Sequence, residues 1–226
     1  MQTEIIVTNV AEAIMAEKYG ADRLELIDDF TFGGLTPDPL LIKQVCESVS
    51  IPVNVMLRPH GRNFVYNQSE IRHLMYEIEY VRGSTWADGI VFGALTEAGN
   101  IDLSLLAQVI KEKERLKLTF HRALDVSTDI FSSYRELLDY PEVDYVLTSG
   151  GMDTAFAGAE TIKQMLALKG ERNNCSILAG CGITPSNALD VMKATGVEQI
   201  HVGSGVRTNG QLDEDKLKKL RSLKYI

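Results

Sequence analysis

Short apolar runs alternate with longer amphipathic stretches along the chain. The short runs are rich in β-branched residues, as buried strands are, and the longer stretches repeat apolar positions at helical spacing. We expect strands at residues 4–8, 23–27, 53–58, 89–95, 117–121, 145–149, 176–180 and 199–203. Helices are expected at residues 10–20, 69–81, 103–115, 129–140, 159–168, 185–196 and 213–224, with a further one around Cys46.

This alternation of eight strands with eight helices predicts an α/β fold, a single-domain (β/α)8 TIM barrel over residues 1–226. Strand–helix repetition implies parallel strands, because each crossover returns the chain to the same end of the sheet. Six strands would favour a doubly wound sheet, whereas eight favour a closed barrel. The pattern contains no proline- or glycine-rich linker, and barrels of this length commonly form one domain.

Several strands carry polar residues where the barrel interior is expected. Alternate residues of a barrel strand face either the helices or the interior. Leu24 and Leu26 belong against helices, which leaves Arg23 and Glu25 inside. The same alternation points inward Asn54, Met56, Arg58, Thr119, His121 and His201.

A candidate pocket follows at the carboxyl ends of these strands, where active sites of this fold lie. It comprises Glu25, Arg58 and His121, with Arg122 and Asp125 on the loop after the fifth strand. The alternative is an interior salt-bridge layer that only fills the barrel. Buried charges are costly unless they are paired, so four polar strands that point to one end favour a ligand site.

The loops after the seventh and eighth strands form a second candidate site, for an anion or a phosphate. Glycine loops at these places commonly bind phosphate through backbone N–H groups and a helix N-terminus. The alternative is a pair of tight turns that require glycine for their backbone shape. The candidate residues are Gly180, Gly182, Gly203, Ser204 and Gly205.

The overall charge narrows the class of partner. A net charge of −8 argues against a nucleic-acid binder and against an anionic membrane surface. No apolar run is long enough to span a membrane, and the N-terminus lacks the features of a signal peptide. The three cysteines form no CxxC pair, which predicts a reducing, cytoplasmic location.

A metal cofactor is not evident from residue spacing. The four histidines show no HExxH or HxH motif; His73 is expected on a helix surface and His60 in an exposed or lid-like loop. Copper(I) prefers thiolate and thioether ligands. Cys181 is the one cysteine expected near the mouth, and is therefore the metal-ligand candidate, whereas Cys46 is expected to be a buried helix residue.

Six motifs together resemble the CutC family of copper homeostasis proteins. They are GADRLEL, GGLTPD, IPVNVMLRPHGRNFVY, TFHRALD, VLTSGG and AGCGIT, in the family's order over residues 20–184. The resemblance implies a (β/α)8 barrel, a cytoplasmic homo-oligomer and a role in copper homeostasis through copper(I). It also implies that the five candidate pocket residues line a shared pocket. Ile6, Val7 and Ile27 stand where many family members carry cysteine.

Three functions are therefore considered. The first is the copper(I) role that the resemblance implies. The second is a TIM-barrel enzyme, an isomerase or lyase, that acts on a small anionic or phosphorylated metabolite at the Glu25, Arg58 and His121 mouth. There Glu25 or His121 would be the general acid/base, and Arg58 and Arg122 would hold the anion. The third is a non-catalytic barrel that regulates other proteins.

Overall fold

The structure is a computed structural model that describes residues 1–28, 30–169 and 175–225. Eight parallel strands close into a barrel in the order β1 to β8, and β1 pairs with β8 to complete it. The strands are β1 Gln2–Val7, β2 Arg23–Leu26, β3 Val53–Met56, β4 Gly89–Phe92, β5 Lys117–Phe120, β6 Tyr145–Thr148, β7 Ser176–Gly180 and β8 Gln199–Val202. The (β/α)8 barrel expected from the sequence is confirmed.

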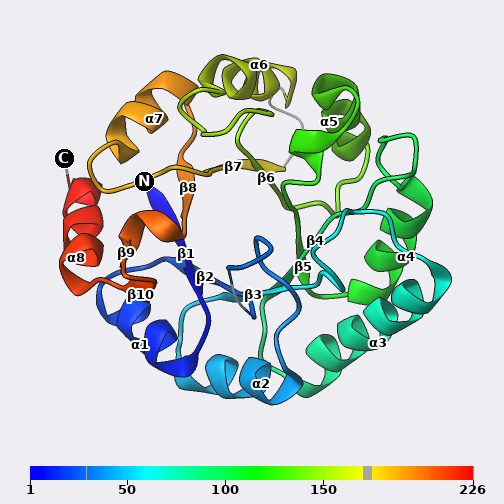
Figure 1. Cartoon of the computed structure of the whole chain (residues 1–226), viewed down its shortest axis with the longest axis horizontal. Coiled ribbons are helices and arrows are strands. Elements are labelled where there is room, and N and C mark those ends of the chain that lie inside the picture. Colours follow the sequence, from blue (N-terminus) through cyan, green and yellow to red (C-terminus); the bar gives the residue numbers. More distant parts are fainter. Residues whose placement is uncertain (29, 170–174, 226) are drawn as a thin grey trace.

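The helices form a ring outside the strands (Figure 1). They are α1 Val10–Lys18, α2 Pro39–Ser48, α3 Gln68–Ser84, α4 Leu103–Lys113, α5 Ile130–Leu138, α6 Ala159–Lys169, α7 Ala188–Thr195 and α8 Glu214–Ser222. Side-chain caps fix where most of them begin. Asn67 and Glu70 form a capping box at α3, and the carboxylates of Asp102, Asp129 and Asp213 accept hydrogen bonds from the first-turn N–H groups of α4, α5 and α8.

The hydrophobic core lies between the strands and the helices. The residues expected to face outward belong to this buried cluster, including Leu24, Leu26, Val53, Val55, Leu118, Phe120, Ile200 and Val202. Their inward-facing neighbours Glu25, Asn54, Thr119, His121 and His201 are buried polar residues. The alternation therefore separates an apolar outer layer from a barrel interior that holds these polar residues together with a smaller apolar cluster of Ile27, Met56 and Val91. No helix among the described residues is long and apolar enough to cross a membrane.

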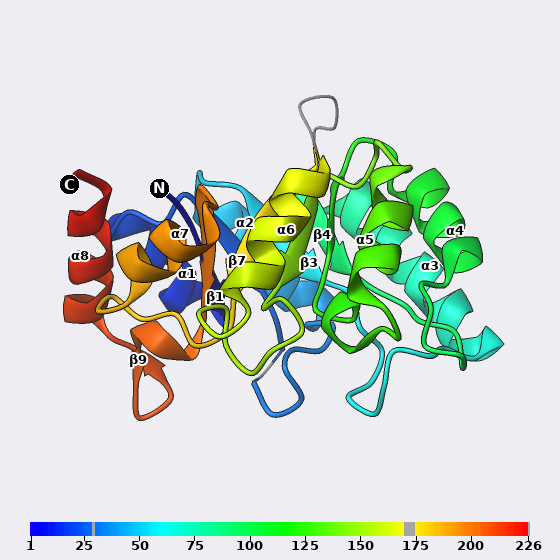
Figure 2. The same ribbon diagram turned by 90° about the horizontal axis from the view of Figure 1, so that it is seen from above.

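A small hairpin that the sequence analysis did not predict lies between β8 and α8. It pairs β9 Arg207–Thr208 with β10 Gln211–Leu212. Its turn is Asn209–Gly210, and both residues have positive φ, as a type I′ turn requires. In the side view of Figure 2 it projects from the same edge as the loops after β2 and β3. Arg207 is buried and pairs with Glu12 of α1, so an ion pair attaches the hairpin to the first helix, near the place where β1 and β8 close the barrel.

Candidate functional site

A cavity of about 420 Å³ opens at the carboxyl ends of the strands. It is lined by all five residues of the candidate pocket: Glu25, Arg58, His121, Arg122 and Asp125. Most of the remaining wall is apolar and includes Ile6, Ile27, Met56, Phe64, Leu147 and Ile183. Charged groups in an apolar wall interact strongly, because little water screens them.

Directly beneath the cavity, Glu4 of β1 binds three neighbouring side chains. Its Oε2 accepts hydrogen bonds from Arg23 Nε at 2.5 Å and Asn54 Nδ2 at 3.1 Å, and its Oε1 lies 2.8 Å from His201 Nδ1. Burial alone would raise the pKa of Glu4. The charges and hydrogen bonds of Arg23 and His201 outweigh it and lower that pKa to about 2. Glu4 is therefore an ionised carboxylate, and both of its oxygens are occupied by contacts with Arg23, Asn54 and His201.

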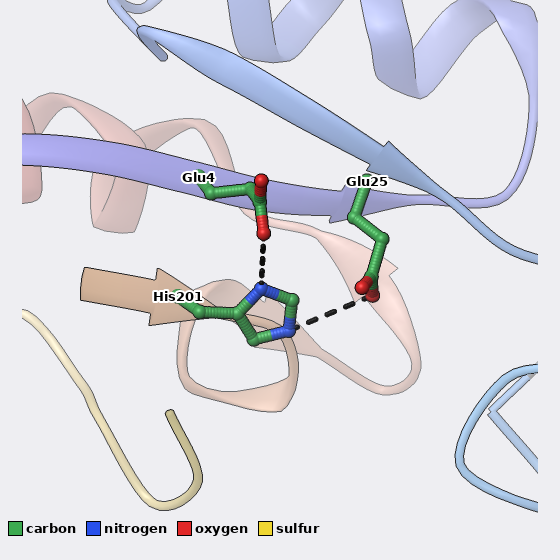
Figure 3. A group of neighbouring side chains, drawn as sticks. All are labelled: Glu4, Glu25 and His201. Atoms are coloured by element: carbon green, nitrogen blue, oxygen red, sulfur yellow. Dashed lines mark hydrogen bonds and ion pairs between the residues drawn. The ribbon is translucent and has the colours of Figure 1, made fainter. Parts of the chain in front are cut away.

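Glu25 lies beside this group, on the cavity wall. Its Oε2 is 3.6 Å from His201 Nε2, and its buried Oε1 has no hydrogen-bond partner among the described residues (Figure 3). Burial raises the pKa of Glu25 to about 7; His201 and Arg23 oppose the shift and the charge of Glu4 adds to it. Burial would lower the pKa of His201, but Glu25 and Glu4 together raise it. Glu25 therefore changes its protonation state near neutral pH.

His121, which lies one residue beyond β5, is a neutral hydrogen-bond donor. Its Nδ1 accepts a hydrogen bond from the Ala123 N–H at 3.1 Å, which leaves the ring proton on Nε2. Burial, together with the charges of Arg58 and Arg122, lowers the pKa of His121 to about 3. The buried Nε2 has no partner in the described part of the chain. A general-base role for His121 does not fit these features, whereas donation to an acceptor on a ligand does.

Arg58 follows β3 and is a buried cation that has no carboxylate against it in the part of the chain that the structure describes. It is 7% exposed, and no ion pair to it is found among the described residues. Its Nη1 donates to the Phe32 carbonyl at 2.5 Å, and its guanidinium lies 4.6 Å from the Phe64 ring centre. The same ring lies 5.0 Å from that of His121. Arg58 and His121 therefore share one wall of the cavity.

Arg122 and Asp125 organise the loops of the mouth. Asp125 accepts hydrogen bonds from Arg122 Nε at 2.7 Å, the Ser149 N–H at 3.0 Å and the Gly151 N–H at 3.2 Å, and also from the Thr148 hydroxyl. Both carboxylate oxygens are thus occupied. These contacts fit a positioning role for Asp125, which ties the loop after β6 to the loop after β5.

Only part of the expected anion loop reaches the cavity. Gly182, Gly203 and Ser204 line it, whereas Gly180 and Gly205 do not. A Cβ at Gly180 would lie 2.6 Å from the Leu147 side chain, and one at Gly205 would lie 1.8 Å from the Ile183 carbonyl oxygen. These two glycines allow close packing within the barrel and between loops, and their assignment to an anion site stays a prediction.

Few of the residues that line the cavity carry the sulfur atoms that soft metal ions prefer. Cys181 lies on the cavity wall with a φ of 79°, which is unusual for a residue other than glycine, and its Sγ donates to the Asp153 carbonyl at 3.0 Å. Cys46 and Cys175 are buried elsewhere, and burial raises the pKa of each thiol to about 12. In the described chain, Glu4, Glu25 and His201 form a group whose atoms lie close enough for one metal ion.

The other two histidines lie outside the cavity lining. His73 is on the exposed side of α3, as predicted, and pairs with Glu77. The side chain of His60 is 13% exposed and lies 3.4 Å from Glu70, so His60 is not exposed, whereas the lid-like role of its loop stays a prediction. Its ring packs edge-on against Tyr66 at 5.3 Å, which accounts for its burial.

Two residues beneath and beside the cavity were missed as site candidates. His201 was expected to face inward but was not assigned to the pocket, and Glu4 was not considered at all. The alternation of β1 carries the missing signal, because Ile5 and Val7 face the helices and Glu4 must then face inward. The cluster also needs β1 beside both β2 and β8, and this arrangement depends on barrel closure.

Comparison with known proteins identifies the family. The family model described as "CutC family" matches residues 1–206. The chain belongs to the CutC family. A Histophilus somni protein named "family protein CutC" is 37% identical over 90% of this chain and 82% of its own. The Homo sapiens protein named "Copper homeostasis protein cutC homolog" is 36% identical over 88% of this chain and 71% of its own.

Solved structures agree with this assignment. The crystal structure described as "Putative Copper Homeostasis Protein CutC from Streptococcus agalactiae" has a TM-score of 0.83 at 29% identity, and the match covers 92% of this chain and 100% of that chain. Phosphoribosylanthranilate isomerase from Thermotoga maritima has a TM-score of 0.66 at 14% identity, with full coverage of both chains. At that identity the likeness shows a shared barrel fold and nothing about chemistry.

Proposed function

We propose that this CutC-family protein acts in copper homeostasis and binds copper(I) in the cavity through the Cys181 thiolate. The observation that carries the proposal is the position of Cys181, the cysteine of the three that lies on the cavity wall. Its left-handed backbone is costly for a residue with a side chain, and such strain concentrates at functional sites. The copper role stated in the names of the relatives supports the same conclusion.

The chemistry of the other donors also favours sulfur as the ligand. Thiolate and thioether ligands select copper(I), and the Met56 thioether also lines the cavity, from the strand on the opposite side of the barrel. The group of Glu4, Glu25 and His201 offers oxygen and imidazole donors, but Glu4 is already occupied by Arg23 and Asn54. His121 is a poor ligand, because its Nδ1 is taken by the Ala123 N–H and its Nε2 carries the proton.

Replacing Cys181 by alanine is expected to weaken copper(I) binding at least 100-fold, because the cavity then lacks its thiolate. Affinity is measured anaerobically by competition with a chromogenic copper(I) chelator. Cys46→Ala is the matched control, since Cys46 is buried outside the cavity, and Glu25→Gln should leave copper(I) affinity unchanged. Equal affinity in wild type and Cys181→Ala would contradict the proposal.

We propose as a second candidate that the same cavity binds a small anionic or phosphorylated molecule. Arg58 supports this most directly, because it is a buried guanidinium without an anionic partner among the described residues. A buried charge is unfavourable unless it is paired. The unpartnered Nε2 of His121 and the wall residues Gly182, Gly203 and Ser204 add further donors around the same space.

Inorganic phosphate is expected to raise the melting temperature of the wild type but not of Arg58→Met. At a tenfold excess over Kd the gain is about 1.4 kcal/mol, or roughly 3–6 °C for a chain of this size. Methionine retains contact with Phe64 but removes the charge. The scan compares phosphate with chloride at equal ionic strength, and an equal shift in both proteins would show general salt stabilisation and exclude the site.

The cytoplasmic location and homo-oligomeric state expected from the family resemblance stay predictions, as does the organisation of residues 1–226 as one domain.

A further inference from the structure

We propose that the cavity catalyses proton transfer at a carbon next to a carbonyl group of a small carboxylate- or phosphate-bearing compound, with Glu25 as the base. Glu4 and His201 position that base, and His121 and Arg58 bind the carbonyl oxygen. This inference rests on the anion binding proposed for Arg58 and extends it from binding to a reaction.

The geometry of Glu25 suits a base, because one carboxylate oxygen faces His201 and the other is available to a bound molecule. Oε2 faces His201 Nε2 at 3.6 Å, whereas Oε1 has no partner among the described residues although the side chain is only 2% exposed. A buried polar atom without a hydrogen bond is uncommon and requires an explanation, such as a ligand. Glu25 also lines the cavity, so a bound molecule can reach it.

His201 is itself fixed from the opposite side. Its Nδ1 lies 2.8 Å from Glu4 Oε1 (Figure 3). The other oxygen of Glu4 accepts hydrogen bonds from Arg23 and Asn54. Because Glu4 is ionised, Nδ1 carries a proton and donates it in this hydrogen bond. Nε2 therefore faces Glu25 in a fixed orientation, and the Glu25–His201 pair can share one proton. Four strands contribute to this arrangement, which gives it rigidity.

His121 and Arg58 supply donors for negative charge that develops on oxygen. The neutral imidazole donates through Nε2, and Arg58 brings a positive charge to the same wall. A carboxylate base near neutrality combined with a neutral imidazole donor suits enolisation. Donors preorganised in an apolar cavity stabilise an oxyanion more strongly than water does.

The reaction balances without any further reagent. The C–H bond next to the carbonyl breaks, its proton forms an O–H bond with Glu25, and its electron pair forms a C=C bond. The carbonyl oxygen then carries the negative charge, opposite His121 and Arg58. Return of a proton from Glu25 to the same carbon restores the C–H bond and the carbonyl group, and completes a hydrogen exchange. Where that carbon carries a hydroxyl group, its O–H proton can move to the enolate oxygen and the Glu25 proton to the former carbonyl carbon, so that a new C=O bond forms and an isomer results. No oxidant or reductant takes part.

The rate is expected to rise with pH as Glu25 loses its proton near pH 7. The charged groups that face Glu25 are His201 on β8, Glu4 on β1 and Arg23 on β2. His201 lowers the pKa of Glu25, so His201→Asn should move the rising limb of the pH profile to higher pH. A purely structural role for His201 would lower the rate without moving the limb.

The test is deuterium exchange in D2O, followed by proton NMR with pyruvate, dihydroxyacetone phosphate and ribulose 5-phosphate as probes. The wild type is expected to speed loss of the signal next to the carbonyl in at least one probe. Glu25→Gln should lower that rate at least 100-fold while its melting temperature and its response to phosphate are kept. Cys46→Ala, a substitution outside the cavity lining, is the control and should exchange at the wild-type rate.

The outcomes distinguish the two proposals. Phosphate stabilisation without wild-type exchange in any probe would overturn proton transfer and leave anion binding intact. Exchange that persists in Glu25→Gln would overturn the assignment of the base. Absence of phosphate stabilisation in the wild type would reject the anion site on which this inference rests.

Discussion

Glu4→Gln is expected to destabilise the protein by about 3–5 kcal/mol, because it breaks a buried ion pair and leaves the other charge uncompensated. Glu4 is 1% exposed and pairs with Arg23 at 2.5 Å, while also binding Asn54 and His201. Glutamine keeps the shape but removes the charge. For a chain of this size the loss corresponds to a fall of roughly 6–20 °C in melting temperature.

The destabilisation caused by Glu4→Gln is expected to depend on pH. The pKa of Glu4 is lowered from its ordinary range to about 2, so its stabilising effect is present above about pH 4.5. It is lost as the pH falls toward 2, and the gap between wild type and Glu4→Gln should narrow over that interval. Glu47→Gln is the control, because Glu47 is half exposed and its 3.9 Å pair with Lys43 is worth little. A constant gap from pH 6 to pH 3 would contradict the account.

Gly205→Ala is expected to destabilise the protein by about 3 kcal/mol or more, at the upper end of overpacking effects. The new Cβ would lie 1.8 Å from the Ile183 carbonyl oxygen and 3.1 Å from the Thr184 Cα. Both neighbours are backbone atoms, so relief requires the loops after β7 and β8 to separate. Chemical denaturation measures the change, and the response to phosphate should weaken with it because these loops border the cavity.

Gly83→Ala is the matched control for this substitution. Gly83 lies in α3, and a Cβ there would meet nothing within 4 Å. Alanine is a better helix former than glycine, so stability should rise by up to roughly 1 kcal/mol. Similar destabilisation by both substitutions would show that the loop contact is not the cause.

The sequence was sufficient to predict the fold because the order of strands and helices and the alternation within each strand predict the same barrel. The residues of β2 illustrate this: Leu24 and Leu26 alternate with Arg23 and Glu25, and both faces take the environment that the alternation predicts. The β9–β10 hairpin was missed because its strands have two residues each, too few to show a period. Its Asn209–Gly210 turn was the available signal.

The candidate site was predictable only in part. The alternation along the strands placed Glu25, Arg58 and His121 at one mouth of the barrel. It predicts which way a side chain points, but not which residues that side chain contacts. Two features depend on the conformations of loops that are far apart in sequence. Asp125 accepts hydrogen bonds from backbone N–H and hydroxyl donors, and Arg58 lacks a carboxylate partner among the described residues. The same is true of Glu4, whose partners come from three other strands.

These contacts also distinguish the roles that the sequence left open. Glu25 and His121 were equal candidates for the general acid/base. Their surroundings now separate them, because burial raises the pKa of Glu25 to about 7 and lowers that of His121 to about 3. The first group can accept a proton near neutrality, whereas the second stays neutral and can donate a hydrogen bond to a ligand through Nε2.

Anomalous scattering at the copper edge would show whether Cys181 binds copper(I) in the barrel cavity. Crystals would be grown and loaded with copper(I) anaerobically. We expect an anomalous peak on the cavity wall within bonding distance of Cys181 Sγ. A peak only elsewhere, or none at stoichiometric copper(I), would show that Cys181 is not the copper(I) ligand.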